Sequence, residues 1–133
     1  MPLNIIVIDD SPIQLLISSK LIQQNKRLKL LGAFTNPFLG LKAIHTMEVD
    51  IVLLDVEMPE IDGFSLKRMF KKPVEVIMNS TRPIFELQAY SHGAIDFIKK
   101  PLSTEQLDSS ISKVMHEDSF FRDQKKVRVA LAS

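Results

Sequence analysis

Three acidic residues follow two largely apolar stretches of the sequence. Residues 3–8 end in Asp9 and Asp10, and residues 51–54 are followed directly by Asp55. An apolar run of this length without alternation is typical of a strand that is covered on both faces, inside a parallel sheet. Open α/β sheets bind ligands outside the carboxyl ends of their strands, so these carboxylates are placed for chemistry. Taken alone, Asp55 is equally compatible with an ordinary polar residue that ends a strand.

Polar groups also follow the next two apolar runs. Ser80 comes shortly after residues 74–78, and Lys100 comes shortly after residues 94–98. If the carboxylates converge, their mutual repulsion requires a cation, and Mg²⁺ is a hard cation that prefers oxygen ligands. A carboxylate oxygen can act as a nucleophile in phosphoryl transfer, while a metal and a lysine ammonium neutralise phosphoryl charge. These residue types therefore suit an acyl phosphate on Asp55.

Strand and helix patterns alternate along the chain and would bring these groups together. Five strand–helix units in a row predict a flavodoxin-like, doubly wound five-stranded parallel sheet of the α/β class, with helices on both faces. The strand order 2-1-3-4-5 places the first and third strands side by side. The predicted strands are 3–8, 28–34, 51–54, 74–78 and 94–98, and the helices begin after Ser11 and Asn36, span 63–70 and 83–92, and begin again after Ser103.

Apolar residues recur at helical spacing within three of these helices. The last helix is expected to bury Leu107, Ile111 and Val114, and to extend the same face to Phe121. In the first two helices the recurring residues are Ile13, Leu16, Ile17 and Leu21, followed by Leu39, Leu41, Ile44 and Met47.

Composition limits the classes of function. A chain of 133 residues fits one domain, and its 17 basic against 16 acidic residues argue against direct nucleic-acid binding. The absence of cysteine excludes disulfides and thiolate metal sites. No apolar stretch approaches the ~18 residues of a membrane span, and the N-terminus turns acidic too early for a signal peptide. We therefore expect a cytoplasmic protein without membrane contact.

Four motifs in this order resemble the receiver domains of two-component response regulators, which have the CheY-like fold. The resemblance extends from about Leu3 to His116. It implies a receiver domain at residues 1–117, and residues 118–133 would extend the last helix or link to an absent effector domain. The motifs are IIVIDDSP (5–12), IVLLDVEMPEIDG (51–63), VIMNST (76–81) and GAIDFIKKP (93–101).

The resemblance implies the roles of the acidic residues. Asp55 matches the phosphoacceptor, which takes a phosphoryl group from the phosphohistidine of a histidine kinase. Asp10 matches a direct Mg²⁺ ligand, and Asp9 matches an acid that acts through a bound water. Asp55 itself and the backbone carbonyl of Glu57 would complete the protein's share of the coordination.

The resemblance also implies how phosphorylation is sensed. Ser80 would hydrogen-bond a phosphoryl oxygen and Lys100 would pair with the phosphate, while Pro101 would follow a cis peptide. Movement of Ser80 would vacate space into which Phe97 turns, switching the face formed by residues 83–98 and the last helix. This face is a candidate homodimer surface, and a downstream effector domain or protein is the other expected partner.

Thr81 departs from the usual family pattern, in which a smaller residue follows the switch hydroxyl. We hypothesise that it narrows access to the phosphoryl group. Glu57 and Arg82 flank the site, either as an ion pair or as two solvated charges, and the second interpretation is slightly favoured. Asp62 is predicted to be a turn residue before Gly63 rather than a metal ligand.

The sequence leaves other functions to consider. A phosphorylation-independent pseudo-receiver, acting as a protein-interaction module, is the alternative, although degenerate receivers generally lose one of the groups that this chain keeps. An aspartyl-nucleophile phosphatase of the haloacid dehalogenase type needs a DxDx[ST] run, which residues 55–59 do not supply. We therefore expect no enzymatic activity beyond slow self-phosphorylation and autodephosphorylation. Residues 31–44 and GAIDFIKKP resemble receivers that precede LytTR-type DNA-binding domains. DVEMPEIDG, VIMNS and GAIDFIKKP also resemble receivers of chemotaxis methylesterases, and the LytTR-type resemblance is preferred. His45, His92 and His116 lack metal-ligand spacing.

Overall fold

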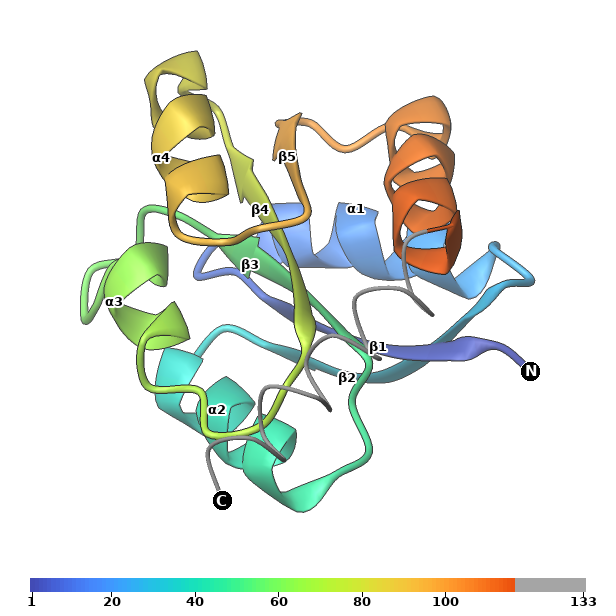
Figure 1. The fold of residues 1–133 in the computed structure, drawn as a ribbon, viewed down its shortest axis with the longest axis horizontal. Coiled ribbons are helices and arrows are strands. Elements are labelled where there is room, and N and C mark those ends of the chain that lie inside the picture. Colours follow the sequence, from blue (N-terminus) through green and yellow to red (C-terminus); the bar gives the residue numbers. More distant parts are fainter. Residues whose placement is uncertain (117–133) are drawn as a thin grey trace, which may run out of the picture.

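Five parallel strands form one sheet in the order β2-β1-β3-β4-β5 in a computed structural model that describes residues 1–116 (Figure 1). The prediction of a flavodoxin-like doubly wound sheet is therefore confirmed. The extension at 118–133 and Phe121 lie outside the described residues. The strands are β1 (Leu3–Ile8), β2 (Leu28–Phe34), β3 (Ile51–Asp55), β4 (Glu75–Ser80) and β5 (Asp96–Lys99).

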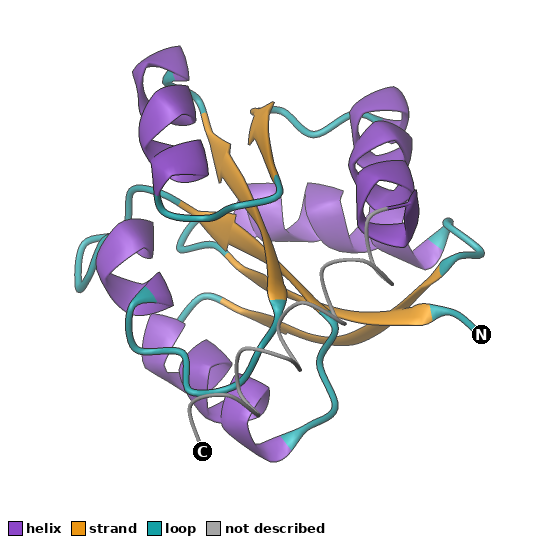
Figure 2. Ribbon diagram, in the orientation of Figure 1, coloured by secondary structure: helices purple, strands orange, loops and turns teal. Residues whose placement is uncertain are grey.

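Helices cover both faces of this sheet (Figure 2). The helices are α1 (Pro12–Gln23), α2 (Pro37–Thr46), α3 (Gly63–Lys67), the short 3₁₀ helix η1 (Pro83–Phe85) and α4 (Glu86–Ser91). A further helix at residues 104–116, called here the C-terminal helix, is the last element described. Within residues 1–116, no helix is both long and apolar enough to span a membrane.

Alternation along the buried strands separates two hydrophobic cores. Ile5 of β1 belongs to the core that contains Ile22 of α1 and Leu107 of the C-terminal helix. Ile8 belongs to the other core, with Ile44 of α2 and further residues of α3 and α4. Residues 51–54 are all buried, as expected for a strand that is covered on both faces. These two cores fix the strand ends that carry the polar groups.

The predicted helix starts are confirmed at two capping residues. The Ser11 side chain accepts a hydrogen bond from the backbone N–H of Gln14. The Asn36 side chain accepts from the backbone N–H groups of Phe38 and Leu39. Each cap satisfies N–H groups that have no partner inside the helix, which stabilises the first turns of α1 and α2.

Helical spacing identified the buried faces of α1 and α2 only in part. Ile13 is 71% exposed and Leu16 is 56% exposed, while Ser18 and Ile22 of the same helix are buried. Apolar residues occur on most sides of α1, so their period does not single out one face. In α2, Ile44 is buried, whereas Leu39 and Met47 are exposed.

Element boundaries differ from the prediction where polar residues continue the sheet. β4 extends through Asn79 and Ser80 because these residues pair with Ile98 and Lys99 of β5. Correspondingly, β5 spans Asp96–Lys99 rather than 94–98. α3 ends at Lys67 rather than near residue 70, and the predicted helix at 83–92 is divided into η1 and α4.

Candidate functional site

The acidic residues meet where β1 and β3 end. Ile8 of β1 pairs with Leu54 of β3, so the residues that follow both lie at the same edge of the sheet. Carboxylate oxygens of Asp9, Asp10 and Asp55 lie within 4.8 Å of one another. Asp9 and Asp55 are buried, with 2% and 4% exposure. The predicted convergence of three carboxylates is therefore present in the structure.

Lys100 reaches this cluster from the far side of β4. Its Nζ lies 2.8 Å from Oδ2 of Asp9 and 3.1 Å from Oδ1 of Asp55, and its side chain is 7% exposed. The backbone N–H of Lys100 donates to the carbonyl oxygen of Ser80 at 2.8 Å, which fixes the start of the loop after β5. The peptide bond between Lys100 and Pro101 is cis, as expected.

Burial and crowding shift the proton equilibria of this cluster. Burial raises the pKa of Asp55 to about 8, with further raising by the charge of Asp9 and a hydrogen bond with Asp10, while Lys100 opposes the shift. Burial alone would lower the pKa of Lys100, but hydrogen bonding to Asp9 and the charge of Asp55 outweigh it, and the pKa is raised. One ammonium faces three carboxyl groups, and further positive charge at the site would favour the ionised form of Asp55.

This donor set fits Mg²⁺. Three carboxylates supply hard oxygen ligands in one cluster, as that ion prefers. The backbone N–H of Glu57 donates to Oδ1 of Asp55 at 3.4 Å, so the β3–α3 loop turns next to the cluster. The assignment of the Glu57 carbonyl as a further ligand stays a prediction. Within residues 1–116, the acidic cluster includes no histidine, and His45 and His92 make other polar contacts.

Gly63 brings the β3–α3 loop close to the acidic cluster. Its N–H donates to the carbonyl oxygen of Val56 at 2.7 Å. A β-carbon at this position would collide with the carbonyl oxygen of Asp55 and would approach Met78 Cε to 2.9 Å. Asp62 accepts hydrogen bonds from the backbone N–H and hydroxyl of Ser65, so it is the N-cap of α3 rather than the predicted turn residue, and it lies outside the acidic cluster.

The predicted switch residues Ser80 and Phe97 lie on β4 and β5. Ser80 is 2% exposed, and its hydroxyl oxygen accepts a hydrogen bond from the backbone N–H of Arg82 at 3.0 Å. Phe97 is 8% exposed and packs in the core on the side of α4. Thr81 is exposed, directly after the switch hydroxyl. The Phe97 ring is buried in this structure. Its rotation on phosphorylation stays a prediction.

Glu57 and Arg82 form an ion pair, whereas the sequence slightly favoured two separately solvated charges. Arg82 Nη1 lies 3.4 Å from Glu57 Oε2, with the two side chains 60% and 47% exposed. The guanidinium carbon also lies 5.6 Å from the centroid of the Phe85 ring in η1. An exposed pair of this kind contributes under ~1 kcal/mol to stability, so its position matters more than its strength.

Asn79 and Asp96 are buried polar residues to which the sequence assigned no functional role. Asn79 is 2% exposed, and its Nδ2 donates to the carbonyl oxygen of Ile98 at 3.0 Å. Asp96 is 7% exposed and accepts hydrogen bonds from several elements. Their burial could have been suspected from the sequence, because each is a polar residue inside an apolar strand pattern. Asn79 lies in VIMNS and Asp96 lies in AIDFI.

Comparison with known proteins agrees with this geometry. The family model of the response regulator receiver domain matches residues 5–112. An uncharacterised response regulatory protein of Vibrio cholerae is 28% identical over 117 residues, covering 86% of this chain and 49% of that protein. A protein-glutamate methylesterase/protein-glutamine glutaminase of Xanthomonas campestris is 32% identical over 106 residues, covering 75% of this chain and 30% of that protein. The chain thus spans half the length of these curated relatives or less.

A solved structure supports the same assignment. The BeF3-activated DrrB receiver domain superposes with a TM-score of 0.71 at 26% identity, covering 87% of this chain and 99% of that one. The family match includes Asp9, Asp10, Asp55, Ser80 and Lys100, all within residues 5–112. The chain therefore belongs to the response regulator receiver domain family, the CheY-like phosphoacceptor domains of two-component signalling.

Proposed function

We propose that this domain accepts a phosphoryl group on Asp55 from the phosphohistidine of a histidine kinase and thereby switches a partner-binding surface. The observation that carries the proposal is the position of Lys100 Nζ between Asp9 and Asp55, inside a cluster of three carboxylates. A buried ammonium beside a buried nucleophile is suited to phosphoryl charge. We propose residues 1–117 as the domain and a cytoplasmic location.

In the proposed transfer, a carboxylate oxygen of Asp55 forms a bond to phosphorus while the bond between phosphorus and the kinase histidine nitrogen breaks. The histidine nitrogen keeps the electron pair and takes up a proton. Lys100, which contacts Asp55 at 3.1 Å, would move its contact to a phosphoryl oxygen. Mg²⁺, held by Asp9 through a water, Asp10, Asp55 and the Glu57 carbonyl, would supply further positive charge against the phosphoryl oxygens.

Ser80 would be the first residue to respond to phosphorylation of Asp55. Its hydroxyl oxygen accepts from the backbone N–H of Arg82, so turning towards a phosphoryl group would break that contact and free the loop that leads into η1 and α4. Phe97 would then turn into the vacated space. Ile84 of η1 is 76% exposed and Leu87 of α4 is 82% exposed. These apolar side chains support a role of this surface in homodimerisation or effector binding.

Intact mass tests the proposal directly. The protein is incubated with acetyl phosphate and either Mg²⁺ or EDTA, and the Asp55→Asn variant serves as the matched control. A phosphoryl adduct of the wild type that requires Mg²⁺ and is absent in the variant is the expected result. If neither wild type nor Thr81→Ala forms an adduct with acetyl phosphate or with a phosphorylated histidine kinase, the alternative of a phosphorylation-independent pseudo-receiver is favoured.

A further inference from the structure

Asp96 is a buried carboxylate that lies outside the acidic cluster. It belongs to β5, is 7% exposed and precedes Phe97. Its Oδ2 accepts a hydrogen bond from the Ser110 hydroxyl at 2.6 Å. Its Oδ1 accepts from the Tyr90 hydroxyl at 3.0 Å, from Lys113 Nζ at 3.0 Å and from the Phe97 backbone N–H at 2.9 Å. One carboxylate therefore joins α4, β5 and the C-terminal helix.

The position of β5 at the edge of the sheet allows this arrangement. Asp96 is in register with Ile77, whose side chain lies in the core beneath the C-terminal helix. α4 packs on the opposite core through Ala89. Among residues 1–116 no strand lies beyond β5, so Tyr90 can reach around the edge of the sheet to a carboxylate that faces the other side. Figure 1 shows α4 and the C-terminal helix on either side of β5.

The donors around Asp96 keep it ionised despite its burial. Burial acts to raise its pKa, but hydrogen bonds from Ser110, Lys113, the Phe97 N–H and Tyr90 outweigh it, and the pKa is lowered. An ionised buried carboxylate strongly requires its donors. Withdrawal of Tyr90 would leave Oδ1 with fewer donors, and the two donors on the C-terminal helix would have to adjust.

We propose that Asp96 is the junction that carries a displacement of α4, through Tyr90, to Ser110 and Lys113 of the C-terminal helix. This inference rests on the proposed function, because phosphorylation at Asp55 is the event that would displace α4. The C-terminal helix is the last element that the structure describes, and it lies on the opposite core from α4. A signal that reaches α4 on one face of the sheet would thus reach the helix on the other face.

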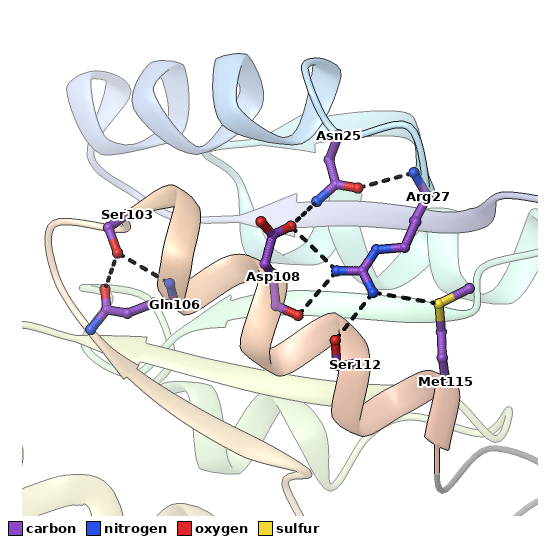
Figure 3. A network of polar contacts seen from close by, with 7 residues as sticks. All are labelled: Asn25, Arg27, Ser103, Gln106, Asp108, Ser112 and Met115. Atoms are coloured by element: carbon purple, nitrogen blue, oxygen red, sulfur yellow. Dashed lines mark hydrogen bonds and ion pairs between the residues drawn. The ribbon is translucent and has the colours of Figure 1, made fainter.

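A separate polar network attaches the same helix elsewhere and provides a control (Figure 3). Arg27, in the loop between α1 and β2, donates to the carbonyl oxygen of Asp108 at 3.1 Å and to the Ser112 hydroxyl at 3.2 Å. It also forms an ion pair with the Asp108 carboxylate at 3.3 Å, and Asn25 donates to that carboxylate at 2.9 Å. This network docks the C-terminal helix without involving α4 or Asp96.

A double-mutant cycle tests the junction in the unphosphorylated protein. Tyr90→Phe and Ser110→Ala each remove one hydroxyl that donates to Asp96, and the two hydroxyls donate to different oxygens. In urea denaturation, the effect of the double variant on the unfolding constant is expected to differ at least about 3-fold from the product of the single effects. Tyr90→Phe combined with Arg27→Gln should be multiplicative. Independence of Tyr90 and Ser110 would overturn the junction.

Hydrogen exchange tests the signalling role. In wild type, beryllofluoride with Mg²⁺ is expected to change amide exchange in both α4 and residues 104–116. Tyr90→Phe should keep the change in α4 and lose most of the change in the C-terminal helix, whereas Arg27→Gln should raise basal exchange there and keep the response.

A full response of the C-terminal helix in Tyr90→Phe would refute the signalling role of Asp96. If beryllofluoride changes exchange nowhere in wild type, the proposed function fails, and the signalling role of Asp96 fails with it. The double-mutant cycle would still decide separately whether the junction exists, because it needs no phosphoryl mimic.

Discussion

Lys100 Nζ lies 2.8 Å from Asp9 Oδ2 and 3.1 Å from Asp55 Oδ1, so one ammonium bridges the ends of β1 and β3 from the loop after β5. The ammonium reduces the repulsion between the carboxyl groups. It also repels Mg²⁺, which would bind to the same oxygens. The same residue therefore stabilises the metal-free site and competes electrostatically with metal binding.

Replacing Lys100 with methionine should separate these two effects. Without Mg²⁺, the free energy of unfolding at pH 7 is expected to fall by about 1–3 kcal/mol. The loss is smaller than for a fully ionised buried pair, because burial and the charge of Asp9 already raise the pKa of Asp55 to about 8. Mg²⁺ affinity, measured by titration calorimetry, should rise because a competing cation is gone. Lys99→Met, at the exposed neighbouring lysine, is the control and should change neither quantity. Weaker Mg²⁺ binding by Lys100→Met would contradict this electrostatic account.

Stability should depend on pH through Asp96. Its pKa is lowered from 3.8, because its hydrogen-bond donors outweigh the effect of burial. A carboxyl with a lowered pKa contributes stability above its unfolded value, and this contribution is lost as pH falls through the folded-state value. Asp96→Asn should therefore cost about 2 kcal/mol near pH 7, and the difference from wild type should shrink below pH ~4. Urea denaturation between pH 3 and 7 measures it, and a pH-independent difference would count against this mechanism.

Thr81 is expected to control access to the phosphoryl group, because it is exposed and directly follows Ser80. Thr81→Ala should increase severalfold both the rate of adduct formation from acetyl phosphate and the rate of its hydrolysis. Thr81→Ser keeps the hydroxyl and removes only the methyl group, so it separates bulk from hydrogen bonding. Mass spectrometry follows both rates, and an unchanged adduct lifetime in Thr81→Ala would argue against a steric role.

Gly63 is expected to tolerate no side chain. In Gly63→Ala, the new methyl group would collide with the carbonyl oxygen of Asp55 and press against Met78. The free energy of unfolding should fall by about 2 kcal/mol, as for other cases of overpacking, and adduct formation at Asp55 should slow because β3 must shift. Chemical denaturation and the acetyl phosphate reaction give the two readouts. A variant with unchanged stability would show that the loop relaxes freely.

The sequence by itself determined the sheet and its acidic edge. Unbroken apolar runs such as residues 51–54 need cover on both faces, which only a parallel sheet flanked by helices provides. The carboxyl ends of such strands share one edge, so the meeting of Asp9 with Asp55 and the approach of Lys100 followed from topology. Helix caps such as Asn36 were readable because they act within three residues along the chain.

Only the tertiary structure decided which helix faces are buried and where isolated polar groups find partners. α1 is apolar on most sides, so packing against the sheet, rather than periodicity, selected Ile22 over Ile13. Arg27 meets Asp108, which lies 81 residues away in the sequence, and no local pattern encodes such a contact. Asp96 can hold α4 and the C-terminal helix together only because β5 is an edge strand, a property of the assembled sheet rather than of any one segment.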